Sequence, residues 1–439
     1  MKGEFAGAVD FGARAIRVVI GRRGADGTVQ IVGHGVAPGR GCVSQGVIQD
    51  LGAAQAALKR ALKAAENEAG VSVDSLFCGV HGRKVETFIR EGNVKLARDV
   101  VERSHMEEAR DIASRDILAP GKQIITSVTA QEWYVDDLRV MDPLSLRGQI
   151  LKIRVHFARL PTVIEHNLVT CIESQRRDME DSVFLPIAAS LGCMTPEDME
   201  LGAAVLDIGR STTGLAVYRD HRILCAHCFE WGGYHLTRDV AAGLQVSFEE
   251  ADDLILEYGL SNARIVSDEE DGDDGECEAG EAEAPSGSEA PVRPDAVTPR
   301  IKLKSVVPGA PPIVERGQLD EIIHERAREL MIRVRQHLHN QGLMKNLVRG
   351  LILTGGGSQI QNCAHLAESV FQVPCRVGVP DTVEIGPAPV RSPEFTAAVG
   401  IIRHAFEFRT ATRNGQSGAN GSIVAAVKSL WSGFRKYYF

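Results

Sequence analysis

Val9-Asp10-Phe11-Gly12 and Leu206-Asp207-Ile208-Gly209 decide the fold of this 439-residue chain. Each stretch ends a short apolar strand in Asp-x-Gly, and a second apolar run follows at once, Ile16 to Ile20 in the first case and Thr213 to Val217 in the second. A strand, a tight glycine turn and exposed backbone N–H groups are what a phosphate or ribose needs for close approach. The two stretches therefore predict a duplicated phosphate-binding hairpin.

A third glycine-rich turn strengthens this prediction. Leu351 to Thr354 reads as a buried strand, and Gly355-Gly356-Gly357 closes it before a helical pattern begins. One Asp-x-Gly motif alone is weak evidence, because it is also ordinary turn chemistry. The order of the three motifs predicts two α/β domains with a nucleotide in the cleft between them. This arrangement is similar to the actin, Hsp70 and sugar-kinase superfamily.

Composition places the chain among ordinary globular proteins, with 44% hydrophobic and 24% charged residues. No apolar run is long enough to span a membrane, and the Met-Lys-Gly-Glu start lacks the apolar core of a signal peptide, so we expect a cytoplasmic protein. The nine cysteines follow no disulfide framework. Cys225 and Cys228 have metal-ligand spacing but lack a second matching pair, so they predict a strand.

The net charge of −9 is concentrated in one segment. Residues 268–289 hold eleven acidic residues and no Lys or Arg, and prolines follow them. Such a segment cannot bury enough apolar surface to offset its ordering entropy, so 267–300 predicts a disordered acidic loop. The rest of the chain is close to neutral and its basic residues are not interleaved with aromatic ones, which argues against nucleic-acid binding.

The chain divides into several predicted domains. Residues 5–36 read as strands and 51–69 as an amphipathic helix. From 84 to 159 the pattern becomes strand, helix and two strands, which predicts a small α+β domain inserted between the two phosphate hairpins. Residues 193–407 carry the second hairpin, and their last helix is a candidate to return to the first domain.

The C-terminus predicts a tethered amphipathic helix. Residues 408–421 have the composition of a flexible linker. Beyond it, residues 422–439 place large apolar side chains on one helical arc with basic residues at its edges, which suits the headgroup region of an anionic bilayer. The alternative is a helix that docks on a partner or on its own domain. The predicted membrane-contacting residues are Ile423, Val424, Val427, Lys428, Leu430, Trp431, Phe434 and Arg435.

At this point the residues resemble one family, FtsA, the actin-like bacterial cell-division proteins that anchor FtsZ filaments to the membrane. The resemblance covers nearly the whole chain and includes the linker and amphipathic tail, which actins and sugar kinases lack. Besides the hairpins it rests on Leu185 to Ser190, Trp231-Gly232-Gly233 and Ala397 to Gly400. It implies subdomain 1A at 1–83 and 160–192, subdomain 1C at 84–159 and subdomains 2A and 2B within 193–407.

The resemblance also implies ligands and partners. ATP with Mg²⁺ would bind between the domains, with Asp10 and Asp207 holding the metal through water; for both aspartates a purely structural role as turn caps remains the alternative. The FtsZ C-terminal peptide would contact Arg326, whose alternative is a solvated helix charge. Filaments would lie at the division site on the cytoplasmic face of the inner membrane, and later division proteins would dock on 1C. The implied nucleotide-binding residues are Asp10, Gly12, Arg14, Arg17, Asp207, Gly209, Arg210, Thr212, Thr213, Gly232, Gly233, Asp252, Gly355, Gly356 and Gly357.

Several residues depart from the family pattern. Ala13 removes a hydroxyl donor from the first phosphate loop, and Arg17 replaces a lysine point charge. Arg210 stands where a glycine normally lets backbone approach phosphate, so it either blocks the site or adds a charge to it. Ile255 replaces a nucleoside-contacting lysine, and Ser182, beside Asp181, takes the position that orients the attacking water. We therefore expect weak or absent ATPase activity.

Two other functions remain open. The chain is alternatively an actin-like assembly protein of pilus machinery, which binding to an FtsZ tail peptide would separate from the first reading. A small-molecule kinase of the same superfamily is disfavoured, because it needs a catalytic carboxylate in the cleft and an unobstructed phosphate site. Ala13, Arg210 and Ser182 argue against both requirements.

Overall fold

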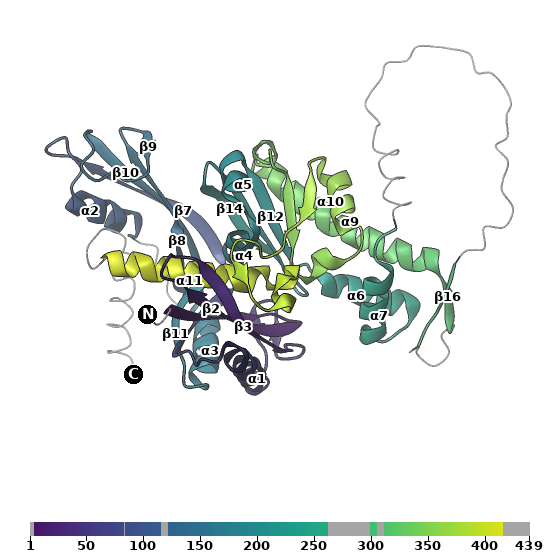
Figure 1. Cartoon of the computed structure of the whole chain (residues 1–439). Coiled ribbons are helices and arrows are strands. Elements are labelled where there is room, and N and C mark those ends of the chain that lie inside the picture. The colour runs from purple at the N-terminus through teal and green to yellow at the C-terminus, as the bar shows by residue number, and fades with distance from the viewer. Residues whose placement is uncertain (1–3, 83, 116–121, 262–298, 305–310, 416–439) are drawn as a thin grey trace, which may run out of the picture. The chain divides into compact units, whose positions relative to one another are not determined.

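The computed structural model describes residues 4–82, 84–115, 122–261, 299–304 and 311–415. It forms two compact units (Figure 1). Unit 1 comprises Met1–Gly233, Gly342–Ser358 and Arg376–Phe439, and unit 2 comprises Tyr234–Gln341 and Gln359–Cys375. The predicted acidic loop, except its last two residues, and the predicted amphipathic helix lie outside the described residues. Within the described part, no helix is long and apolar enough to cross a membrane.

A six-stranded sheet carries the first hairpin in unit 1. Its order is β11-β6-β1-β2-β3-β19, and short strands β4 (Val43–Ser44) and β5 (Val47–Ile48) pair separately. Helices α1 (Leu51–Ala69) and α3 (Thr162–Glu173) bury apolar faces in the same core. The strands are β1 (Glu4–Phe11), β2 (Ala15–Arg23), β3 (Val29–Pro38), β6 (Ser75–Val80), β11 (Asp178–Phe184) and β19 (Glu384–Ile385). The strands predicted over 5–36 and the helix predicted over 51–69 are confirmed.

A five-stranded sheet of order β14-β13-β12-β17-β18 carries the second hairpin. Its strands are β12 (Ala203–Ile208), β13 (Thr213–Arg219), β14 (Arg222–Phe229), β17 (Leu351–Thr354) and β18 (Cys375–Val377). β12 is antiparallel to β13 and parallel to β17, just as β1 is antiparallel to β2 and parallel to β6. The repeat seen in the sequence is therefore a repeat of topology, and Cys225 and Cys228 lie in a strand as predicted.

Helices α4 (Leu185–Cys193) and α11 (Thr396–Gly415) join the two sheets into one core. Every residue of α4 is buried, and α11 packs against α4, β1 and β2. The two helices cross so closely that a Cβ atom on Gly400 would lie 1.6 Å from the Ala188 carbonyl oxygen. α11 also corrects the predicted linker: residues 408–415 continue the helix, because Phe408 is a buried member of the core.

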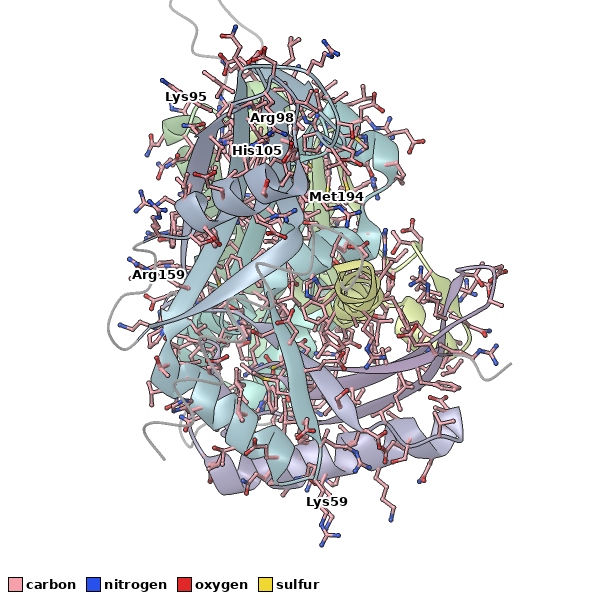
Figure 2. The ribbon with its side chains drawn as sticks, turned by 90° about the vertical axis from the view of Figure 1, so that its left-hand side faces the viewer. Lys59, Lys95, Arg98, His105, Arg159 and Met194 are labelled. Carbon is pink, nitrogen blue, oxygen red and sulfur yellow. The ribbon has the colours of Figure 1, made fainter. Side chains whose placement is uncertain are left out.

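The segment from 84 to 159 folds around its own apolar cluster. Strands β7 (Glu86–Lys95), β8 (Lys122–Val135), β9 (Leu138–Val140) and β10 (Ile150–Pro161) form a sheet of order β7-β10-β8-β9. Helix α2 (Arg103–Ala113) covers it and contributes Met106 and Ala109 to the cluster. Figure 2 shows Lys95, Arg98 and His105 in this inserted domain, and Lys59 on α1 at the other end of the view.

Unit 2 is mostly helical. It contains α6 (Gly233–Leu244), α7 (Phe248–Tyr258), α9 (Arg316–Asn340), α10 (Cys363–Phe371) and a hairpin of β15 (Arg300–Lys302) with β16 (Ile313–Glu315). Helix α9 buries Leu319, Ile323, Leu330 and Val334, which recur at helical spacing. Because β15 begins at Arg300, the acidic loop predicted over 267–300 ends before that residue.

Candidate functional site

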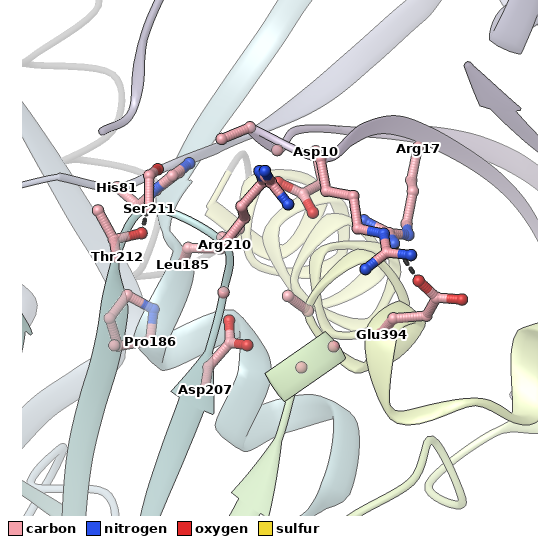
Figure 3. Close-up of a pocket in the computed structure, with 18 of the residues that line it drawn as sticks. Asp10, Arg17, His81, Leu185, Pro186, Asp207, Arg210, Ser211, Thr212 and Glu394 are labelled. Atoms are coloured by element: carbon pink, nitrogen blue, oxygen red, sulfur yellow. Dashed lines mark hydrogen bonds and ion pairs between the residues drawn. The ribbon is translucent and has the colours of Figure 1, made fainter. Parts of the chain in front are cut away.

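A pocket lies at the turns of the two phosphate hairpins, entirely within unit 1 (Figure 3). The space between these residues is about 700 Å³, a volume that includes open solvent. Residues of both hairpins, the β6 end, α4, the Gly355 turn and the start of α11 line it. They are Asp10, Gly12, Ala13, Arg14, Arg17, His81, Leu185, Pro186, Asp207, Gly209, Arg210, Ser211, Thr212, Gly214, Cys228, Gly355, Gly356, Pro393, Glu394 and Ala397.

Hydrogen bonds connect the two hairpins across this pocket. The Nδ1 atom of His81 lies 3.0 Å from Thr212 Oγ1, and its Nε2 atom lies 3.4 Å from the Phe11 carbonyl oxygen. The backbone N–H of Gln45 donates to Ser211 Oγ over 3.0 Å. These contacts hold the two turns in a fixed relation, so one ligand can contact both.

Two aspartates, Asp10 and Asp207, face the pocket. Asp10 is buried, its Oδ1 atom has no hydrogen-bond partner, and burial raises its pKa against the opposing effect of His81 and Arg17. Burial raises the pKa of Asp207 to about 7, and the nearby Asp10 adds to that rise. Paired carboxylates with raised pKa values are typical of sites that bind a cation or a proton.

Arginines supply the opposite charge. Arg14, Arg17 and Arg210 all line the pocket. Arg17 forms an ion pair with Glu394, and its guanidinium lies 5.5 Å from the centre of the Phe395 ring. Figure 3 shows the side chains of Arg17, Glu394 and Arg210 around the same space as Asp10. A cluster of guanidinium groups beside backbone turns is suited to a phosphate chain.

The third motif closes the pocket at Gly355. Its φ of 79° is accessible mainly to glycine, and a Cβ atom there would lie 2.3 Å from Asp207 Oδ1. The Gly355 N–H donates to the Pro393 carbonyl over 3.2 Å. The turn therefore brings bare backbone against the second aspartate.

Some predicted site residues support the pocket from behind. Thr213 Oγ1 donates to the Trp231 carbonyl over 2.7 Å, and the Gly233 N–H donates to the Gly209 carbonyl over 2.9 Å. Gly232 packs on the same loop, and Gly357 packs against Ile208. These four residues hold the second loop and the glycine turn, but none of them lines the pocket.

Two other predicted residues belong to unit 2. Asp252 accepts a hydrogen bond of 2.6 Å from Thr237 Oγ1. Arg326 forms ion pairs with Asp239 and Glu329 and is about one-quarter exposed. Arg326 is therefore a paired residue of α9, in contrast to a fully solvated charge.

The pair placed at the water-orienting position lies away from the pocket. Ser182 is buried in β11, and Asp181 Oδ2 lies 3.1 Å from His404 Nε2. Neither residue lines the pocket. Asp181 is instead paired to α11.

Sequence reasoning missed His81, Ser211, Cys228 and Glu394. His81 follows β6, which is parallel to β1, and side chains after neighbouring parallel strands meet at one edge of a sheet, so topology could have found it. Glu394 lies in a short turn, Pro393–Phe395, three residues before the Ala397 to Gly400 motif but outside it. No spacing in the chain points to it.

Two stretches of the chain match known family models. Residues 204–400 match the family model described as "Cell division protein FtsA", and residues 82–158 match "SHS2 domain inserted in FTSA". The chain belongs to the FtsA family. The second match coincides with the domain whose separate core was described above, so this FtsA member has the inserted domain at the expected position.

Curated relatives agree over nearly the whole chain. The "Cell division protein FtsA" of Pseudomonas aeruginosa is 25% identical over 92% of this chain and 90% of its own length. That of Neisseria meningitidis is 26% identical over 97% of both chains. That of Escherichia coli K12 is 24% identical over 96% and 94%.

Solved structures show that the fold is actin-like. A "PilM-PilN type IV pilus biogenesis complex" aligns with a TM-score of 0.59 at 17% identity, covering 91% of this chain and 98% of that one. MreB5 of Spiroplasma citri bound to ADP aligns with a TM-score of 0.52 at 14% identity, covering 94% and 99%. Both similarities concern the fold alone.

The donor set of the pocket fits a magnesium ion held through water and phosphate. Among the described residues no group of three His, Cys, Asp or Glu side chains could hold a metal ion directly. The pocket offers two such side chains, Asp10 and Asp207, and the Oδ1 atom of Asp10 has no hydrogen-bond partner. Mg²⁺ usually keeps several waters and takes one or two carboxylates plus substrate phosphates.

Proposed function

We propose that this FtsA member is a nucleotide-binding adaptor that assembles into filaments on the cytoplasmic face of the inner membrane and tethers FtsZ there. The observation that carries the nucleotide part is the convergence of both Asp-x-Gly hairpins and the Gly355 turn on one pocket. Family membership supports the cell-division role. The membrane part rests on the amphipathic pattern of residues 422–439.

Each group in the pocket has a role in this proposal. Asp10 and Asp207 would position the waters of a Mg²⁺ ion, which neutralises phosphate charge when bound. Arg17 and Arg210 would pair with the phosphate chain, and backbone at Gly355 and Gly356 would approach the nucleoside. His81 would keep the two loops together through Phe11 and Thr212.

The same pocket supports little hydrolysis. In-line attack requires a group that orients water against the terminal phosphate. Ser182 and Asp181 lie outside the pocket, and the carboxylate of Glu394 is engaged by Arg17. We propose that nucleotide acts as an assembly ligand with weak or no turnover.

Titration of the full chain with Mg-ATP by calorimetry tests the nucleotide site. We expect micromolar binding, and we expect Arg210→Ala to weaken it about tenfold, because a charge-assisted hydrogen bond contributes about 1.5–3 kcal/mol. Arg22→Ala is the matched control, since Arg22 lies on the same hairpin strand as Arg17 but pairs with Gln30 at the surface. Absence of binding at millimolar ATP would reject the nucleotide site and leave a nucleotide-independent scaffold.

The proposed FtsZ contact involves unit 2. Arg326 presents a half-buried guanidinium on α9, held by Asp239 of α6 and by Glu329. Carboxylates of an acidic peptide could replace Asp239 and Glu329 as partners of Arg326. Because these ion pairs are partly solvated, the exchange would leave no buried charge without a partner. The later division proteins would contact the inserted domain.

Binding of a labelled FtsZ C-terminal peptide, measured by fluorescence anisotropy, tests this contact. Arg326→Ala should weaken binding at least about tenfold. Arg333→Ala serves as the control, because Arg333 pairs with the same Glu329 and is about half exposed. Equal losses in both variants would mean only a general charge effect, and no binding by the unchanged protein would favour the pilus alternative.

A further inference from the structure

The ion pair between Arg17 and Glu394 occupies the arginine that the proposed nucleotide site needs most. Arg17 Nη2 donates to Glu394 Oε2, and both residues line the pocket. An arginine can make a bidentate pair with only one carboxylate or phosphate group on a given edge. The carboxylate of Glu394 and an oxyanion of a ligand would therefore compete for the guanidinium of Arg17.

The two partners differ in their freedom to move. The side chain of Arg17 is only 9% exposed and its Nε atom has no hydrogen-bond partner, whereas the side chain of Glu394 is 33% exposed. A guanidinium held in a buried position requires a counter-ion, while a carboxylate at the surface can turn into water at little cost. Exchange would therefore move Glu394 and leave Arg17 in the pocket.

Contacts of the neighbouring residues add to this ion pair in holding the backbone around Glu394. The Pro393 carbonyl accepts from the Gly355 N–H over 3.2 Å and lies 3.1 Å from Thr354 Oγ1. Phe395 is buried, and its ring lies edge-on to His34 with centroids 5.8 Å apart. The turn η4 (Pro393–Phe395) is thus tied to the glycine turn on one side and to the core on the other, and α11 begins at the next residue.

We propose that Glu394 is a built-in counter-ion of Arg17 that a phosphate chain must displace. Glu394 thereby sets the affinity of the pocket and its selectivity for phosphorylated nucleotides over uncharged nucleosides. A nucleoside without phosphate offers Arg17 no replacement charge and leaves the pair intact. Displacement frees the Glu394 side chain and loosens η4, the segment from which α11 begins. The inference rests on the proposed nucleotide function.

Calorimetry on the full-length protein with Mg-ATP and with adenosine tests this role. Glu394→Gln keeps the shape of the side chain and removes its charge, so ATP should bind about tenfold more tightly while adenosine affinity stays the same. Glu384→Gln is the matched control, because it changes the net charge equally at an exposed position on β19. Unchanged or weaker ATP binding by Glu394→Gln, with normal binding by the original protein, would overturn the counter-ion role alone.

A second measurement does not need any ligand. Hydrogen exchange of residues 388–400 should be faster in Glu394→Gln than in the original protein or in Glu384→Gln, since the ion pair that restrains η4 is weakened. Equal exchange in all three proteins would show that Glu394 does not restrain the turn. Binding of neither ATP nor adenosine by any variant would instead reject the nucleotide site, and with it this function of Glu394.

Discussion

Removal of residues 422–439 is expected to abolish flotation of the protein with liposomes that contain anionic lipid. The segment gathers Trp431, Phe434 and aliphatic residues on one predicted arc, with Lys428 and Arg435 at its edges. Burial of such an arc in the interface, together with lipid charge, is what binds a peripheral helix. The loss should be nearly complete, because the truncation removes the whole apolar arc together with both flanking basic residues.

Two comparisons make this result specific. The double variant Lys428→Glu with Arg435→Glu keeps the apolar arc but should float less well with anionic vesicles. Because salt screens charge, raising the salt concentration should also reduce flotation of the original protein and so narrow the difference between the two proteins. A variant with Arg139→Glu changes a basic residue in the inserted domain and should float normally. Undiminished flotation of the truncated protein would exclude residues 422–439 as the anchor and favour a docking helix.

Gly400→Ala is expected to destabilise the protein severely. One added methyl group would lie 1.6 Å from the Ala188 carbonyl oxygen, so α11 and α4 would have to separate. Overpacking of a buried helix crossing costs about 1–3 kcal/mol or more. We expect the melting temperature to fall by about 5–10 °C, given a shift of about 2–4 °C per kcal/mol for a domain of this size.

The same substitution at Gly52 provides the control. Gly52 lies in the first turn of α1, and a Cβ atom there would approach nothing closer than 3.6 Å. Gly52→Ala should therefore stabilise the protein slightly, because alanine restricts the unfolded chain. Equal melting temperatures for the two variants would mean that the α4–α11 crossing is looser than the structure has it.

The parts of the fold that the sequence predicts are those set by local pattern. Alternating apolar runs at Val9 and Leu206 produce strands, and the helical spacing from Leu51 produces α1. The prediction of a linker from residue 408 was wrong, because α11 runs to Gly415. Arg409 and Thr410 belong to a polar, linker-like stretch by composition, but tertiary contacts extend the helix through them. Arg409 pairs with Glu180 and donates to the Phe5 carbonyl, neither of which is visible from local sequence.

The site divides in the same way. Residues within the glycine turns were predicted because turn chemistry requires particular residue types at fixed spacing. Glu394 and His81 reach the pocket through the long-range packing of α11 and β6, and their neighbours in sequence carry no corresponding signal. Arg326 was predicted as a contact, but its pairing with Asp239 depends on how α6 lies against α9 within unit 2.

The inserted domain also has a consequence for how such chains diversify. Its first and last strands are neighbours, with Glu86 opposite Arg159 in the antiparallel register of β7 and β10. Paired residues of this kind lie about 5 Å apart, so the chain enters and leaves the inserted domain at two neighbouring points. An inserted domain joined at such a pair of points can be gained, changed or exchanged in evolution without rearranging the two sheets that carry the proposed nucleotide pocket.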